Sequence, residues 1–176
     1  MKIGVLALQG DFARHKAALR RIGVEPDEVK KPGELDAVSG LIIPGGESTT
    51  LLKLMDAGPF VPALEKFHAD GRPIFGTCAG LIDVAVERNA YGRQKESFEA
   101  EGQACLDGAA GPLTMVFIRA PRIRRLGPRV ASLASHRGEC VMAREGSVLV
   151  ATFHPELTDD PTVHRYFAEM VRYAAL

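Results

Sequence analysis

The residues best suited to covalent chemistry are a cysteine in a glycine-rich turn and a histidine beside a carboxylate. Cys78 lies in the segment GTCAG (76–80), directly after the apolar pair 74–75. Glycines two positions on either side of a nucleophile suit a tight turn from a strand into a helix, because only small residues fit there. The N-terminus of a following helix lowers the pKa of a cysteine, and the amide of Ala79 can point at a developing oxyanion. The alternative interpretation is a buried structural cysteine.

A thiol nucleophile needs a base, and the base needs a partner that orients it. His154 and Glu156 supply both, with Pro155 between them, directly after the apolar run 148–153. Proline restricts the local backbone, so the imidazole and the carboxylate keep little freedom. The alternative is a histidine that ends a strand with a satisfied hydrogen bond. The remaining histidines have neighbours that favour a surface position: His15, His68, His136 and His164.

A third motif, PGGEST (44–49), also follows an apolar run. Two glycines allow a peptide group to turn its amide toward an anion, although a plain turn that caps a helix is the simpler interpretation. In open α/β sheets, ligands bind beyond the carboxyl ends of the strands. We therefore expect this loop, Cys78 and His154 to meet at one edge of a sheet.

The elements that must position these motifs alternate between strands and helices in the first half of the chain. This order predicts an α/β three-layer sandwich, with a mainly parallel central sheet between helices. Expected strands there are 3–8, 41–43 and 73–75; expected helices run from a cap at Asp11 to Gly23, from Ser48 or Thr49, and over 60–69. Closely spaced strand signals in the second half predict an antiparallel extension, at 84–86, 113–118, 130–133, 140–143 and 148–153. Asp159, Asp160 and Pro161 predict the start of a last helix, and without a linker we expect one domain over 1–176.

Composition restricts the classes of function. The 176 residues carry 22 Lys and Arg against 22 Asp and Glu, so no net field favours nucleic acid. The basic segment 119–129 contains no interleaved aromatic residue, which favours a solvated loop or a subunit contact over nucleic-acid binding. No apolar run approaches the roughly 18 residues of a membrane helix. Three cysteines cannot all pair within one chain, so we expect a cytoplasmic protein in which Cys105 and Cys140 have no role.

Six segments together make a resemblance specific. They are VLALQGDF (5–12), LIIPGGESTT (41–50), FGTCAGLI (75–82), VERNAYGRQKESFEAE (86–101), VFIRAP (116–121) and FHPELTDD (153–160). The chain resembles the glutaminase subunit of pyridoxal 5'-phosphate synthase, a family of triad-type class I glutamine amidotransferases. The G-x-C-x-G and H-P-E motifs occur in many amidotransferases, whereas PGGEST, VERNAYGRQ, FIRAP and HPELTDD are typical of this family.

The resemblance implies a role for each matching residue. Cys78 would be the nucleophile that attacks the side-chain amide of L-glutamine, His154 the general base and then acid, and Glu156 the group that orients His154. The reaction would release ammonia and leave a glutamyl thioester, which water hydrolyses to glutamate. Backbone amides of Gly46 and Ala79 would form the oxyanion hole. The substrate pocket would further include Glu47, Ser48, Arg88, Ile118 and Arg119.

The resemblance also implies a partner. The ammonia would pass through an internal tunnel to a synthase subunit, which makes pyridoxal 5'-phosphate (vitamin B6) from pentose and triose phosphates in a hetero-oligomeric complex. The glutaminase alone would have little activity. No cofactor, metal, nucleic acid or membrane is implied. An amidotransferase subunit of another synthase, and a cysteine hydrolase that uses no glutamine, are the alternative enzymes.

One segment departs from the family pattern. Only Leu81, Ile82 and Asp83 separate Gly80 from the expected strand 84–86, whereas a helical crossover needs about a dozen residues or more. On the order of 15 to 20 residues are therefore absent, judging by ordinary helix and loop lengths. Either the sequence omits residues that the molecule contains, which the intact flanking motifs favour, or the deletion is genuine. A genuine deletion would strain the turn and favour a non-catalytic regulatory subunit.

Overall fold

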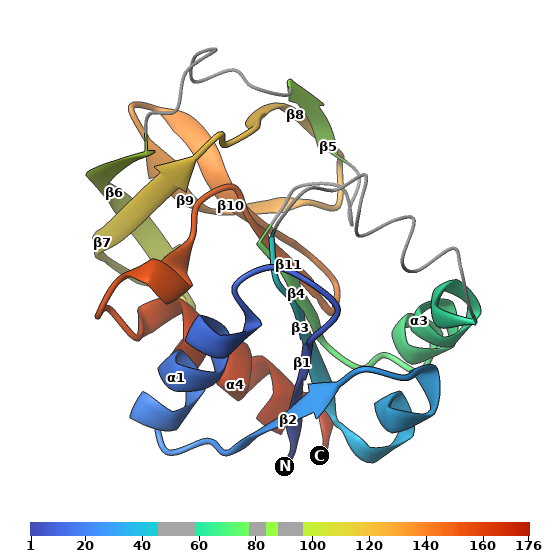
Figure 1. Ribbon diagram of the computed structural model, residues 1–176. Helices are drawn as coiled ribbons and strands as arrows, with labels where there is room; N and C mark the ends of the chain where they lie inside the picture. The colour runs from blue at the N-terminus through green and yellow to red at the C-terminus, as the bar shows by residue number, and fades with distance from the viewer. Residues whose placement is uncertain (46–58, 78–83, 88–96) are drawn as a thin grey trace.

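The computed structural model describes residues 1–45, 59–77, 84–87 and 97–176. Its largest element is a nine-stranded mixed sheet (Figure 1). Five neighbouring strands are parallel, in the order β2 (Pro26–Val29), β1 (Ile3–Leu6), β3 (Gly40–Ile43), β4 (Ile74–Gly76) and β11 (Val148–Ala151). Four antiparallel strands extend it, in the order β10 (Glu139–Glu145), β9 (Ala131–His136), β6 (Ser97–Leu106) and β7 (Ala109–Ile118). The expected parallel sheet with an antiparallel extension is confirmed.

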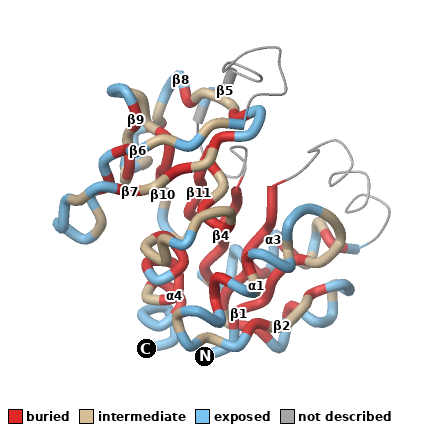
Figure 2. Tube along the Cα trace, turned by 60° about the vertical axis from the view of Figure 1, so that its left-hand side comes forward, coloured by how far each residue is buried: buried red, intermediate tan, exposed pale blue. Residues whose placement is uncertain are grey.

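The strands at the centre of the parallel half are apolar on both faces. Every residue of β1, β3, β4 and β11 is buried, as expected for strands covered from both sides (Figure 2). The register aligns Leu41 with Ile74, and Ile74 with Val148. Because β3, β4 and β11 are parallel and in step, their carboxyl ends lie side by side at one edge of the sheet.

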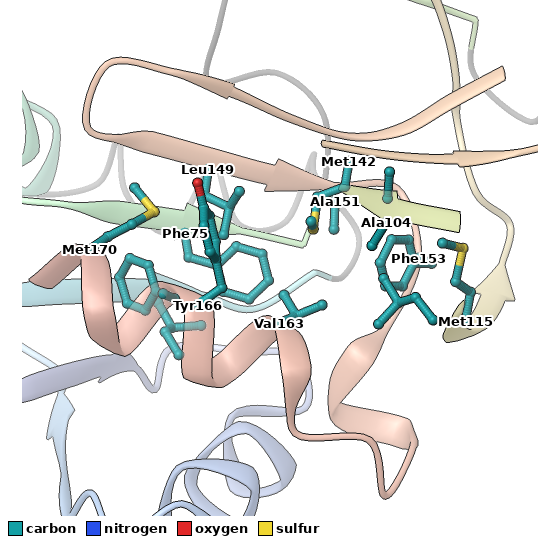
Figure 3. Close-up of a cluster of buried hydrophobic side chains, with 14 of the residues drawn as sticks. Phe75, Ala104, Met115, Met142, Leu149, Ala151, Phe153, Val163, Tyr166 and Met170 are labelled. Atoms are coloured by element: carbon teal, nitrogen blue, oxygen red, sulfur yellow. The ribbon is translucent and has the colours of Figure 1, made fainter. Parts of the chain in front are cut away.

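Helices cover both faces of this half. On one face, α1 (Phe12–Arg21) and α4 (Thr162–Ala174) contribute Leu19, Val163 and Phe167 to a core that includes Phe75 of β4, part of which Figure 3 shows. On the other face, the short 3-10 helix η1 (Pro32–Ala37) and α3 (Phe60–Ala69) pack against the neighbouring residues of the same strands. Each fully buried apolar side chain stabilises this packing by about 1.5–3 kcal/mol. The expected three layers are confirmed.

The helix boundaries agree with most of the sequence signals. The helix expected over 60–69 is confirmed, and Gly23, at φ +79°, follows the end of α1 in a conformation that suits glycine. The last helix starts as expected directly after residues 159–161, with Pro161 at the N-cap position. The Thr162 amide donates a hydrogen bond to the Asp160 carboxylate at 2.9 Å. Asp11 occupies the N-cap position of α1, but its side chain makes no capping hydrogen bond. The helix expected from Ser48 or Thr49 lies outside the described residues.

The observed strands correct several expectations. The strands β2, β6 and β8 (Arg122–Leu126) had no counterpart in the sequence prediction. The strand expected at 84–86 exists as β5 (Val84–Glu87), but it pairs with β8 in a separate two-stranded sheet. The basic segment is therefore partly a strand, not a loop, and Arg122 pairs with Glu139 at 2.8 Å.

No helix in the described part of the chain is long and apolar enough to cross a membrane.

Candidate active site

Three of the motifs meet at the carboxyl edge of the parallel strands. The Gly45 amide, after β3, donates a hydrogen bond to the Thr77 hydroxyl, after β4, at 2.5 Å. A Cβ atom on Gly45 would lie 2.2 Å from the Thr77 carbonyl oxygen and 3.3 Å from Cε1 of His154. Glycine is thus required at position 45, because any side chain would collide with backbone. Thr77, which directly precedes Cys78 in the sequence, therefore lies near His154.

The His154 imidazole is held by a buried carboxylate. Beyond β11 the chain continues to His154, whose backbone amide donates to the Val116 carbonyl oxygen of β7 at 2.8 Å. The 3-10 helix η2 (Pro155–Leu157) then turns Glu156 back toward the ring. His154 Nδ1 lies 2.7 Å from Glu156 Oε1, and the side chain of Glu156 is completely buried. A carboxylate only accepts hydrogen bonds, so Nδ1 carries the proton and Nε2 is left to take up or release one.

Two further histidines lie behind this pair. His15 of α1 has its Nε2 atom 3.4 Å from Glu156 Oε2, and its Nδ1 atom 3.0 Å from Nε2 of His164 in α4. Both side chains are fully buried. Burial, followed by the neighbouring His164, lowers the pKa of His15 well below its ordinary value. Burial lowers the pKa of His164 to about 4. Both imidazoles are therefore neutral near neutral pH.

The expected surface position is wrong for three histidines. His15 and His164 are fully buried, and His136 is 8% exposed, with its ring against Phe117. Only His68 is exposed as expected. The helical spacing of apolar residues could have predicted burial of His15 and His164. His15 shares a face with residues 18, 19 and 22, and His164 with residues 167, 168 and 171, all of them apolar.

The expected substrate residues Ile118 and Arg119 lie near this edge of the sheet. They follow Val116, which accepts the hydrogen bond from the His154 amide. Ile118 is 39% exposed, and Arg119 is exposed with φ +47°, a conformation uncommon outside glycine. The remaining expected site residues lie outside the described residues: Gly46, Glu47, Ser48, Cys78, Ala79 and Arg88.

The other two cysteines lie in the antiparallel strands of the sheet. Cys105 is exposed in β6, and Cys140 is half-buried in β10, where its thiol donates to the Met142 carbonyl oxygen at 3.3 Å. Burial raises the pKa of Cys140, which is the opposite of thiolate activation. Both are free thiols. Within the described ranges, no group of three His, Cys, Asp or Glu side chains could hold a metal ion.

Comparisons with known proteins show the family of this chain. The model of the SNO glutamine amidotransferase family matches residues 5–84 and 80–173. The pyridoxal 5'-phosphate synthase subunit PdxT of Thermotoga neapolitana is 48% identical over 98% of this chain and 100% of its own length. The PdxT of Koribacter versatilis is 50% identical, over 98% of this chain and 96% of its own length. A solved glutamine amidotransferase structure superposes with a TM-score of 0.88 at 44% identity, covering 97% of this chain and 98% of that one.

The fold is that of the class I glutamine amidotransferases. Within that class, the chain belongs to the SNO glutamine amidotransferase family. The resemblance to the glutaminase subunit of pyridoxal 5'-phosphate synthase is thereby confirmed, and so is the enzyme class, a glutaminase.

The comparisons also bear on the short connection after Gly80. The alignment with the Thermotoga neapolitana protein spans 189 positions, more than the 176 residues of this chain. The two matched parts of the family model meet at residues 80–84. Residues present in the relatives thus have no counterpart in this sequence. The connection itself lies outside the described residues.

Proposed function

We propose that Cys78, His154 and Glu156 form a catalytic triad that hydrolyses L-glutamine to L-glutamate and ammonia. The contact of 2.7 Å between His154 Nδ1 and the buried Glu156 carboxylate carries the proposal, because it fixes the tautomer that a general base requires. The hydrogen bond from Gly45 to Thr77 supports it further, because a Cβ on Gly45 would lie 3.3 Å from Cε1 of His154, which places the segment before Cys78 near the base.

The reaction divides into acylation and deacylation. His154 Nε2 takes the proton of the Cys78 thiol, and the thiolate attacks the side-chain amide carbon of glutamine. The same imidazole, now protonated, gives its proton to the leaving nitrogen, so ammonia departs and a glutamyl thioester remains. His154 then removes a proton from water, which attacks the thioester. Collapse of this second intermediate releases glutamate and returns a proton to the thiolate.

The remaining residues of the proposed site bind charge. The backbone amides of Gly46 and Ala79 are proposed to stabilise the oxyanion of each tetrahedral intermediate. The Arg88 guanidinium is suited to the substrate carboxylate, since the two groups can form paired hydrogen bonds. The rest of the glutamine pocket is proposed to consist of Glu47, Ser48, Ile118 and Arg119.

The proposed partner is the synthase subunit of pyridoxal 5'-phosphate synthase, because the relatives are named as subunits of that enzyme. An ammonia molecule released into water at neutral pH is quickly protonated and loses its nucleophilicity. A subunit that makes ammonia for synthesis is therefore expected to hand it over within a complex. We propose one amidotransferase domain over residues 1–176; the cytoplasmic location stays a prediction.

An assay of ammonia release from glutamine tests this function. We expect glutamate and ammonia in equal amounts, and a rate that rises at least about tenfold when the cognate synthase subunit is added, because docking completes the oxyanion hole. Addition of an unrelated amidotransferase partner is the control. The intact mass of the assayed protein should be recorded, since a mass above 19.0 kDa identifies omitted residues after Gly80. Absence of hydrolysis at that higher mass, with the synthase subunit bound, contradicts the proposal.

A further inference from the structure

Two buried polar atoms beside the proposed triad face each other without a hydrogen-bond partner. Glu156 Oε1 is satisfied by His154, but within the described part of the chain Glu156 Oε2 accepts no hydrogen bond, and His15 Nε2 makes none. These two atoms are 3.4 Å apart. Unpaired buried polar atoms are rare in folded proteins, and each calls for a physical explanation.

The proton positions on the histidines follow from the contacts. A hydrogen bond between His15 Nδ1 and His164 Nε2, at 3.0 Å, needs one donor and one acceptor. If His15 carried its proton on Nδ1, the lone pair of Nε2 would face the Glu156 carboxylate and repel it. If His164 Nε2 donates instead, His15 carries its proton on Nε2 and directs it at Glu156 Oε2. The second arrangement satisfies both contacts with neutral imidazoles.

We propose that His15 is a positioning residue for catalysis. It holds the second oxygen of Glu156, while His164 fixes the tautomer of His15. This inference rests on the proposed function, because Glu156 must be the group that orients His154. The series of neighbouring polar side chains thus runs from His154 through Glu156 and His15 to His164. It links the base at the sheet edge to helices α1 and α4.

The His15 contact matters most when charge develops. As His154 becomes an imidazolium during turnover, its attraction for Glu156 grows, and a carboxylate held by one oxygen alone can rotate away from the productive geometry. A neutral N–H donor on the other oxygen opposes that rotation and stabilises the anion without competing for the proton. Hydrogen bonds of catalytic groups are often long in free enzymes and shorten when substrate is bound. The separation of 3.4 Å agrees with that behaviour.

The aromatic packing around His15 makes it a rigid support. The His15 and His164 rings both meet Phe75 of β4 edge-on, at centroid distances of 6.1 and 6.2 Å. Phe75 also packs against Phe167 of α4. Since β4 leads directly to Thr77, the same aromatic cluster supports the base and the strand that precedes Cys78 in the sequence. A support fixed by packing holds the catalytic geometry better than a mobile one.

The test compares two substitutions of His15 that differ in the atoms they retain. His15→Gln retains an N–H donor near the position of Nε2, whereas His15→Phe retains the ring shape and removes every donor. In the complex with the synthase subunit, we expect His15→Phe to lower kcat for glutamine hydrolysis about 10- to 100-fold. The KM for glutamine should stay within about twofold, because His15 does not touch substrate. His15→Gln should recover kcat to within about threefold of wild type.

His136→Phe is the matched control, since it also replaces a buried imidazole packed against phenylalanine. Its kcat is expected to match wild type. If His15→Phe does not fold, His15→Asn replaces it, because the shorter amide keeps the Nδ1-like position and loses the donor toward Glu156. His154→Ala is measured in parallel, and full activity in that variant overturns the proposed function itself. If His154→Ala is inactive but folded His15→Phe or His15→Asn has the wild-type kcat, only the role of His15 is overturned. Failure of His15→Gln to restore kcat likewise overturns only that role.

Discussion

Replacing Cys78 with alanine is expected to abolish glutamine hydrolysis while binding of the synthase subunit is retained. The alanine has no atom that can attack the amide carbon, so the thioester cannot form and the whole covalent route is lost. Removal of a triad nucleophile typically lowers kcat by about 10⁴-fold or more. Steady-state ammonia release measures the loss, and co-elution with the synthase subunit measures binding.

The other cysteines provide the control for this result. Cys105→Ala changes an exposed thiol in β6, and Cys140→Ala changes a half-buried thiol in β10. Both variants should hydrolyse glutamine at the wild-type rate. Glutamine turnover retained by Cys78→Ala would exclude Cys78 as the nucleophile. So would loss of turnover in a Cys105→Ala variant that is fully folded.

Substitution of Glu156 by glutamine is expected to lower kcat by about 10³- to 10⁴-fold with little change in structure. The amide has nearly the shape of the carboxylate, but its nitrogen is a donor. When that nitrogen faces His154 Nδ1, the ring must carry its proton on Nε2, where the base needs a lone pair. The same substitution places the other polar atom of the amide against His15, at a position where the carboxylate oxygen now lies 3.4 Å from Nε2.

Glu25→Gln is the control for loss of a negative charge, because Glu25 pairs with Arg20 at the surface and its side chain is 72% exposed. That variant should keep the activity of wild type. Glutamine hydrolysis by Glu156→Gln at more than about a tenth of the wild-type kcat is incompatible with Glu156 as the group that orients the base.

The sequence was sufficient to predict the edge of the sheet where the site lies. Apolar runs that end in PGG, at Thr77 and at His154 mark neighbouring parallel strands, and the contacts of Gly45 bring these ends together. The H-P-E spacing likewise anticipated the contact between His154 and Glu156, because only a proline separates them. Local spacing is informative when the interacting residues lie within one turn.

His15 and His164 could not be paired with each other from the sequence. They are 149 residues apart, and they meet only because α1 and α4 pack on the same face of the sheet. Charged residues on the opposite sides of both helices suggested a surface position, although the helical spacing of apolar residues indicated burial. Each helix buries one stripe, so the polarity of sequence neighbours says little about a residue within that stripe.

The pairing of strands in the second half was also beyond the sequence. The runs at 84–86 and 122–126 are both short, and nothing local distinguishes pairing with each other from pairing with the main sheet. Likewise, β6 contains Glu99, Glu101, Gly102 and Gln103, so its strand signal is weak. It gains its structure from ten aligned partners in β7, which is a tertiary effect.

The measurement that tests the proposed triad most directly is the distance between the Cys78 sulfur and Nε2 of His154. A crystal structure of the chain in complex with its synthase subunit would give this distance. We expect about 3–4 Å, close enough for a proton to pass between the two atoms. A separation beyond about 8 Å in that complex, with glutamine in the pocket, would mean that these groups do not act together.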